Sequence, residues 1–209
     1  KTKAALFERP RVTKVRFSRS SVNVTVDGGI VRAATVIVTT GTATAEFKPL
    51  QRHFKPRESY LVLTEPVPTA MRKQLGQPGL LLRDLRSPQH RLAWTRDGRI
   101  LFGGADQDAV PDRTRDAVLV QRTGQLMYEL LTMYPVISGL QPEYGWDVPY
   151  GQTADGVMYI GPHRNYPRHL FALGAGGDSI TGAFLSARIL VRALGRSPDK
   201  ADAAFGWTR

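Results

Sequence analysis

The chain has no cysteine at any of its 209 positions. This absence excludes disulfide bonds, thiolate metal sites, cysteine nucleophiles and attachment of a cofactor through a cysteine thioether. The sequence also has no G-x-S-x-G motif for a nucleophilic serine and no His, Asp and Glu cluster with the spacing of metal ligands. We therefore predict no metal site, and only a cofactor that is held without a thioether bond.

Long apolar runs are missing as well. No stretch is long enough to cross a bilayer, and the apolar part of the N-terminal sequence KTKAALFERPRV is too short for a signal peptide. A hydrophobic content of 42% is nevertheless enough to bury a core. The composition predicts a folded, soluble and unexported protein, which we expect in the cytoplasm.

Acidic residues are scarce: 18 Asp and Glu face 29 Lys and Arg, which gives a net charge of +11. A basic surface of this kind attracts phosphates. The excess is dense only before Arg19, however, and no RNA-binding aromatic motif, zinc-finger spacing or helix-turn-helix pattern accompanies it. A basic domain that binds anions or nucleic acid is therefore the last of the functions that we consider.

The most informative stretch is LFALGAGGDSITGAFLSARILVRALG, residues 170–195. An apolar run ends at Leu173, a glycine turn covers 174–177, and Asp178 or Ser179 can cap an amphipathic helix. Glycines let a ligand approach the backbone, and the helix N-terminus attracts negative charge, so the turn suits a pyrophosphate or a flavin edge. The alternative is a tight connection without a ligand, since GAGGDS lacks the third glycine of G-x-G-x-x-G.

A β-meander is predicted near the N-terminus. Its strands are Val12–Phe17, 21–26 and 30–33, with Asp27-Gly28-Gly29 as a hairpin turn. The next run, 34–40, is apolar on both faces and predicts a strand buried on both sides of a layered sheet. Because ligands bind at the carboxyl ends of such strands, Thr39, Thr40 and Gly41 are expected beside a ligand.

The middle of the chain has mixed patterns. RLAWTRDGRILFGGAD predicts a hairpin around Asp97-Gly98-Arg99, and the apolar spacing from Arg115 to Tyr134 predicts an amphipathic helix. A strand with Trp146 is expected before Gly161. The segments 106–115 and 162–169 are interpreted as loops.

Several of these motifs together resemble the D-amino-acid-oxidase-like (DAO) family of FAD-dependent oxidoreductases. FERPRVTKV, GIVRAATVIVTTG, PRESYLVLTEPVP, the D-G-R hairpin and QTADGVMYIGP occur in the order that this family shows. Thr39 and Met158 stand where the family commonly has alanine and proline, and Ala175 and Asp178 depart from its histidine-rich versions of the glycine turn.

The resemblance implies an α/β plus α+β fold. Residues 1–54 and 151–209 would form an incomplete Rossmann-like FAD-binding domain with the β-meander, and 55–150 an antiparallel-sheet substrate-binding domain with helices. The implied cofactor is noncovalent FAD. Its expected contacts are Val12, Thr39, Thr40, Gly41, Gly174, Ala175, Gly176, Gly177, Asp178, Ser179, Ile180 and Thr181.

This family begins with a βαβ unit that carries G-x-G-x-x-G, and the sequence has no such unit. We therefore interpret the chain as the C-terminal portion of a larger flavoprotein, which by itself binds FAD weakly or not at all. The implied partner is the missing N-terminal segment or another chain that supplies it. A noncatalytic subunit of a multisubunit flavin dehydrogenase is the open alternative.

The implied activity is oxidation of an amine or amino acid by hydride transfer to flavin N5. Arg83 and Arg96 are candidates for binding a substrate carboxylate, because guanidinium suits bidentate contact. Trp94 and Trp146 are candidates for the cavity wall. His90 is a candidate for proton transfer, whereas the other histidines, His53, His163 and His169, are interpreted as surface residues of polar loops. The sequence assigns no catalytic residue and does not identify the substrate.

Overall fold

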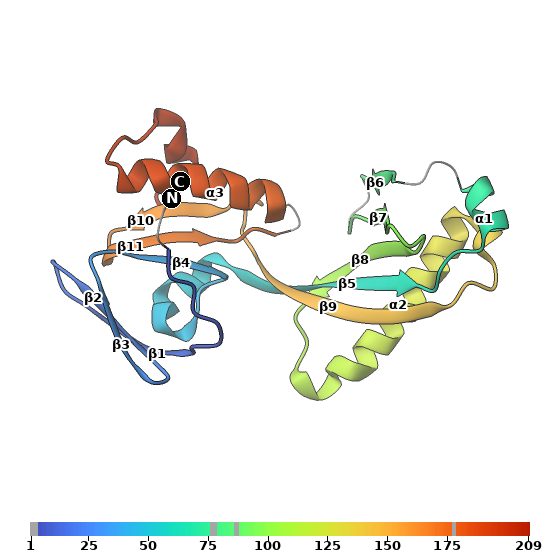
Figure 1. Cartoon of the computed structure of the whole chain (residues 1–209), viewed down its shortest axis with the longest axis horizontal. Helices are drawn as coiled ribbons and strands as arrows, with labels where there is room; N and C mark the ends of the chain where they lie inside the picture. Colours follow the sequence, from blue (N-terminus) through green and yellow to red (C-terminus); the bar gives the residue numbers. More distant parts are fainter. Residues whose placement is uncertain (1–3, 76–78, 86–87, 177–178) are drawn as a thin grey trace. The chain divides into compact units, whose positions relative to one another are not determined.

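The computed structural model describes residues 4–75, 79–85, 88–176 and 179–209. The chain divides into two compact units (Figure 1). One consists of Lys1–Lys55 and Gly151–Arg209, and the other of Pro56–Tyr150. None of the helices within the described ranges is long and apolar enough to cross a membrane.

The first unit opens with the expected β-meander, which the structure confirms. Its strands are β1 (Val12–Phe17), β2 (Val22–Val26) and β3 (Gly29–Ala33), paired antiparallel in the order β1-β2-β3. Gly28, with φ of +96°, makes the turn into β3, because an L side chain rarely adopts this backbone region.

A second three-stranded sheet forms the centre of this unit. Its order is β10-β11-β4, from β10 (Tyr159–His163), β11 (Tyr166–Leu173) and β4 (Val36–Gly41). β10 and β11 are antiparallel, whereas β11 and β4 are parallel. The remaining elements are η1 (Ala45–His53), α3 (Ser179–Leu194) and η3 (Lys200–Phe205).

The strand alternation of β11 explains the two layers around this sheet. Phe171 and Leu173 pack with η1 in one buried cluster, and Leu170 and Ala172 pack with α3 in another. The helix α3 accordingly covers one face of the sheet, and η1 with the meander lies on the other (Figure 1).

Three expectations for this unit were wrong. β4 is not buried on both faces: among the described strands it pairs only with β11, and Ile37 is 43% exposed at this open edge. Residues 162–169 are not a loop but form most of the β10–β11 hairpin. His169 therefore lies within β11, 1% exposed, and not on a polar surface. Hairpin pairing satisfies the backbone of this stretch despite its polar composition.

The second unit contains a five-stranded sheet in the order β6-β7-β8-β5-β9. The strands are β5 (Lys55–Thr64), β6 (Leu81–Arg83), β7 (Arg91–Trp94), β8 (Ile100–Asp108) and β9 (Pro142–Gln152). The helices are α1 (Thr69–Gln74), α2 (Asp112–Met133) and η2 (Pro135–Ile137). Strand pairs β6–β7, β7–β8 and β8–β5 are antiparallel.

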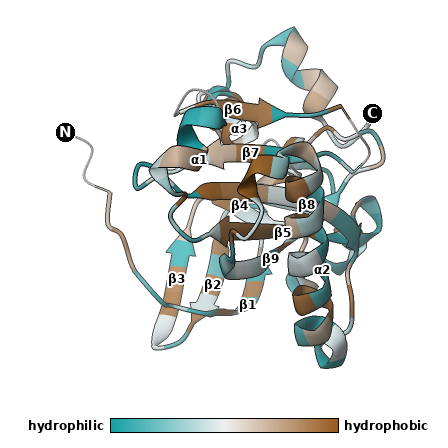
Figure 2. Ribbon diagram, turned by 90° about the vertical axis from the view of Figure 1, so that its right-hand side faces the viewer, coloured by the Kyte–Doolittle hydropathy of each residue, from teal (hydrophilic) through white to brown (hydrophobic). Residues whose placement is uncertain are grey.

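One face of this sheet packs against α2. Tyr60, Val62, Leu92 and Phe102 join Leu126 and other helix residues in one buried core, and Figure 2 shows hydrophobic colour along β5, β7 and β8. The expected D-G-R hairpin is confirmed, with Gly98 at φ of +79°.

The predicted loop at 106–115 was wrong. β8 continues to Asp108 and α2 begins at Asp112, so only three residues connect them. Pro111 precedes the helix with φ of −61°, a value that proline fixes, and Asp112 in the first turn suits the positive end of the helix dipole.

Candidate functional site

The carboxyl ends of β4 and β11 lie side by side in the first unit. Leu173 is opposite Gly41, and the backbone N–H of Gly174 donates to the carbonyl oxygen of Gly41 at 2.8 Å. Both glycines have positive φ, +77° at Gly41 and +83° at Gly174. The turns after β4 and β11, which we predicted to lie beside a ligand, therefore begin at the same edge of the sheet.

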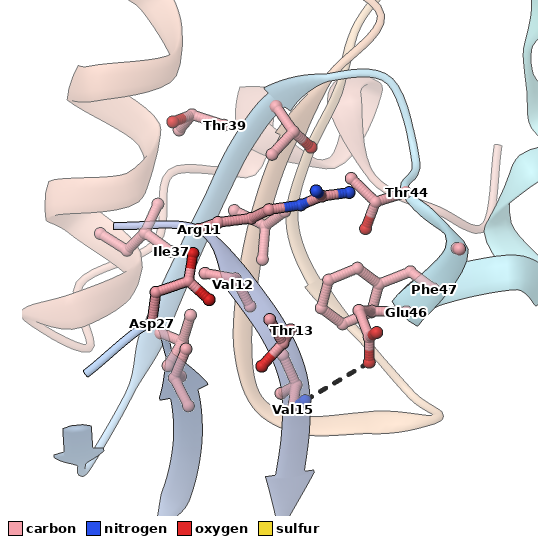
Figure 3. A pocket seen from close by; sticks show the side chains of 15 residues that line it. Arg11, Val12, Thr13, Val15, Asp27, Ile37, Thr39, Thr44, Glu46 and Phe47 are labelled. Carbon is pink, nitrogen blue, oxygen red and sulfur yellow. Dashed lines mark hydrogen bonds between the residues drawn. The ribbon is translucent and has the colours of Figure 1, made fainter. Parts of the chain in front are cut away.

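A cavity of about 720 Å³ lies between β4 and β1 (Figure 3). Val12, Thr39 and Thr40 are part of its wall. In Figure 3 the side chain of Arg11 extends toward Thr44. The cavity therefore brings together three of the residues predicted from the sequence to contact the cofactor.

A second cavity, of about 520 Å³, lies between β4 and α3. Ile37 and Thr39 line both cavities, so the two meet along the open edge of β4. Gly41 and Ala175, both predicted site residues, also line the second cavity, and its remaining wall is mostly apolar. One cavity therefore lies on each side of the open edge of β4.

The turn after β11 is open toward solvent at Gly176. Gly176 has φ of +50°, and a Cβ atom built on it would meet no other atom within 4 Å. Ile180 is 87% exposed and Thr181 is exposed in the first turn of α3, whose backbone N–H groups have no partners within the helix. Gly177 and Asp178 lie outside the described residues, as does the side chain of Ser179.

These features fit the ring end of a flavin. The backbone of Gly41 and of 174–176, with the start of α3, offers a surface that a planar ring can approach closely. Thr153 adds a polar group, because its Oγ1 is buried without a hydrogen-bond partner in the described structure, and its Cγ2 lies against Gly174. An unpartnered buried hydroxyl beside such a turn is what a polar ring atom of a ligand would satisfy.

A family model for FAD dependent oxidoreductases (DAO) matches residues 1–193. The chain belongs to this family. The family resemblance seen in the sequence motifs is thereby confirmed, and the family to which the chain belongs is FAD-dependent.

Known proteins show the same fold. Glycine oxidase from Geobacillus kaustophilus superposes with a TM-score of 0.73 at 18% identity, covering 98% of this chain and 53% of that one. L-proline dehydrogenase from P. horikoshii gives 0.73 at 17% identity, covering 95% and 52%. Probable oxidoreductase OrdL of Haemophilus influenzae is 26% identical over 147 residues, 69% of this chain and 31% of that protein. The chain thus spans about half the length of the two solved structures.

The predicted substrate residues of the DAO-family chain lie in the second unit and are not gathered at one point. Arg83 is on β6, and Arg96 is exposed in the turn between β7 and β8. Trp94 packs against the core of the unit, and Trp146 lies on β9 with 37% of its surface exposed.

One further arginine was missed. Arg91 on β7 lies directly opposite Arg83 on β6, and its Nε is buried without a hydrogen-bond partner among the described residues. Leu82 and Leu92 pack against the core, so the alternation places both arginines on the opposite face of the sheet. In the sequence, Arg91 is the first residue of the predicted strand RLAW. Its position next to the apolar Leu92 could have indicated that it lies on the face opposite the core.

His90 is not free for proton transfer within this unit. Its Nδ1 lies 2.7 Å from Asp84 Oδ2 and its Nε2 lies 2.9 Å from Glu129 Oε2. Burial alone would lower the pKa of His90, but the hydrogen bonds to the two carboxylates outweigh it and raise the pKa above 6.5. The ring therefore connects the loop before β7 to α2.

Proposed function

We propose that this DAO-family chain forms the flavin-facing part of an enzyme that oxidises an amine or an amino acid. The observation that carries the proposal is the junction of Gly41 and Gly174, which lies at the end of two parallel strands and beside two cavities. Glycine oxidase and L-proline dehydrogenase, which have this fold, are named for amino-acid substrates.

The residues of the chain would position the cofactor ring. Backbone groups at Gly41, Gly174 and Gly176 approach it closely, and the N–H groups of Ile180 and Thr181 stabilise negative charge on it. When bound, the flavin would accept a hydride at N5 from the carbon that bears nitrogen, which leaves an imine for hydrolysis by water.

A substrate carboxylate would bind on the outer face of the sheet in the second unit. Arg83 and Arg91 provide two guanidinium groups on neighbouring strands, which suit charge-assisted hydrogen bonds to a carboxylate. Arg83 also donates from Nε to Gln89 Oε1 at 2.9 Å, which holds its side chain in place. Arg96, Trp94 and Trp146 remain the other candidates for substrate contact.

Polypeptide beyond these 209 residues would hold the adenylate end of FAD. The open edge of β4 has unpaired backbone groups, and the apolar cavity beside α3 adjoins it, which suits an added strand. We propose that this strand comes from the same gene product, that the chain alone binds FAD weakly, and that the enzyme acts in the cytoplasm. A partner chain that supplies the strand to a noncatalytic subunit is the alternative.

The test compares two glycine variants of the complete gene product. Gly176 and Gly28 both have positive φ and both have space for a Cβ atom, but only Gly176 lies at the proposed flavin site. We expect Gly176→Ala to weaken FAD binding about tenfold or more, because the methyl group blocks the approach of the ring. Gly28→Ala should leave flavin content unchanged.

Flavin content is measured by absorbance per mole of protein, and affinity by the change in flavin fluorescence. Anaerobic bleaching of the flavin by a panel of amines and amino acids then identifies the substrate class. Equal loss of flavin in both variants would contradict the site, and a flavin that no amine or amino acid bleaches would contradict the activity.

A further inference from the structure

A third cavity, of about 500 Å³, lies in the first unit and shares no wall residue with the two cavities along β4. The end of η1, the strand β10 and the turn after it form one side. The helix α3 contributes Ile189 and Ala193, and the C-terminal segment contributes Trp207. Nothing in the proposed flavin chemistry uses this cavity.

Basic groups dominate its wall. Arg52 and His53 come from η1, His163 from β10, and Arg164 from the following turn. Neither Arg52 nor Arg164 forms an ion pair within the part of the chain that the structure describes. Arg52 donates from Nε to His53 Nε2 at 3.5 Å, but neither guanidinium charge is balanced by a carboxylate among the described residues, so both can attract an anion.

The one carboxylate in the wall is already bound. Arg192 donates from Nε to Asp202 Oδ2 at 2.9 Å, and a second hydrogen bond joins Arg192 Nη2 to Asp202 Oδ1. The backbone N–H of Asp199 also donates to Asp202 Oδ2. Asp202 thus compensates Arg192 and leaves the positive charge of the cavity unbalanced.

The pKa values of both histidines in the wall, His53 and His163, are lowered. Burial, Arg52 and Arg209 lower the pKa of His53, and burial, His53, Arg164 and Arg52 lower the pKa of His163. Asp155 is the carboxylate that pairs with Arg209, at 2.7 Å. The two rings are therefore neutral at neutral pH, and an anion in the cavity would favour their protonated forms.

Aromatic and apolar groups complete the wall. Trp207 stacks on Tyr159 with ring centroids 4.6 Å apart and meets the rings of His53 and His163 edge-on at 5.5 and 5.1 Å. Its Nε1 is buried and has no hydrogen-bond partner in the described structure. Ile160 also lines the cavity and adds apolar surface.

We propose that this cavity binds a small organic anion, in which a carboxylate or phosphate group contacts Arg52 and Arg164 and an apolar body rests against Trp207 and Ile160. Guanidinium groups suit both anions because each presents paired oxygens. The size of the cavity is within the range of small-molecule sites. The site is separate from flavin binding and does not depend on it.

The experiment follows the four histidines of the chain by NMR, each as a function of pH, with chloride, inorganic phosphate, benzoate or uncharged benzamide at equal ionic strength. His53 and His163 should titrate at higher pH with phosphate or benzoate than with chloride. His90 and His169 are internal controls, because neither lines the cavity. His53→Gln and His163→Gln assign the signals.

The double variant Arg52→Gln with Arg164→Gln should weaken anion binding about tenfold or more, through loss of charge-assisted hydrogen bonds. The matched control, Arg16→Gln with Arg32→Gln, removes two exposed arginines of the meander and should leave binding unchanged.

A response to phosphate alone assigns a phosphate ligand, and a response to benzoate alone or to both assigns a carboxylate on an apolar body. The proposal is overturned if neither anion moves the two histidines relative to chloride, if benzamide moves them equally, or if both double variants lose binding equally.

Discussion

Gly174 and Thr153 are in such close contact that a Cβ atom on Gly174 would lie 2.7 Å from Cγ2 of Thr153. The same atom would lie 3.1 Å from Cε1 of Phe54. Since real Cβ atoms essentially never approach another atom to 2.7 Å, glycine is favoured here by packing as well as by its φ of +83°. The turn is therefore held between Thr153, which follows β9, and Phe54, which follows η1.

We predict that Gly174→Ala destabilises the protein by about 2–4 kcal/mol, the sum of left-handed backbone strain and overpacking. The matched control is Gly41→Ala, because Gly41 has φ of +77° but no neighbour within 4 Å of an added Cβ. Gly41→Ala should cost only the strain, about 1–2 kcal/mol. Urea unfolding measures both, and equal losses would show that the contact with Thr153 is not tight.

His90 makes stability depend on pH. Its folded pKa is raised above the ordinary value of 6.5, so its stabilising effect is complete below pH 6.5 and is lost as pH rises through the folded pKa. We predict that His90→Gln lowers the free energy of unfolding by about 1–3 kcal/mol at about pH 6 and by less at about pH 9.

The control for His90 is His163→Gln. The pKa of His163 is lowered, so its contribution has the opposite sign: it is present above pH 6.5 and is lost as pH falls. Unfolding by urea at several pH values measures both differences. A His90→Gln difference that stays constant with pH would show that the ring is neutral between Asp84 and Glu129.

The sequence predicted elements whose pattern is local. The alternation of β1 and β2, the Asp-Gly turns and the apolar spacing of α3 each determine a structure within about fifteen residues, and all are confirmed. The connection between β11 and α3 was also located correctly, with positive φ at Gly174 and Gly176, whereas the predicted turn residue Gly177 lies outside the described residues.

Features that depend on distant partners were not predictable. His169 reads as polar in sequence, yet it is buried because Phe17 and Phe47 surround it from other elements, with ring centroids at 5.1 and 5.5 Å. β4 has the composition of a central strand, but its neighbours decide whether it is an edge. Arg91 became a candidate only when strand pairing placed it opposite Arg83.

The hydroxyl of Tyr60 forms a hydrogen bond with the buried carboxylate of Glu58. Its Oη donates to Glu58 Oε2 at 2.7 Å and accepts from Gln107 Nε2 at 2.9 Å. Burial and the hydrogen bond to Glu58 raise the pKa of Tyr60 to about 12. The phenol therefore stays protonated and continues to donate at any pH at which the protein is normally handled.

We predict that Tyr60→Phe destabilises the protein by about 1–3 kcal/mol. The carboxylate of Glu58, which is only 6% exposed, would lose a hydrogen-bond donor that water cannot easily replace. The control is Tyr128→Phe, at a tyrosine that is 71% exposed, which should change stability by less than about 0.5 kcal/mol. Thermal and urea unfolding give the difference. A Tyr60→Phe protein as stable as the control would mean that the hydrogen bond between Tyr60 and Glu58 does not stabilise the fold.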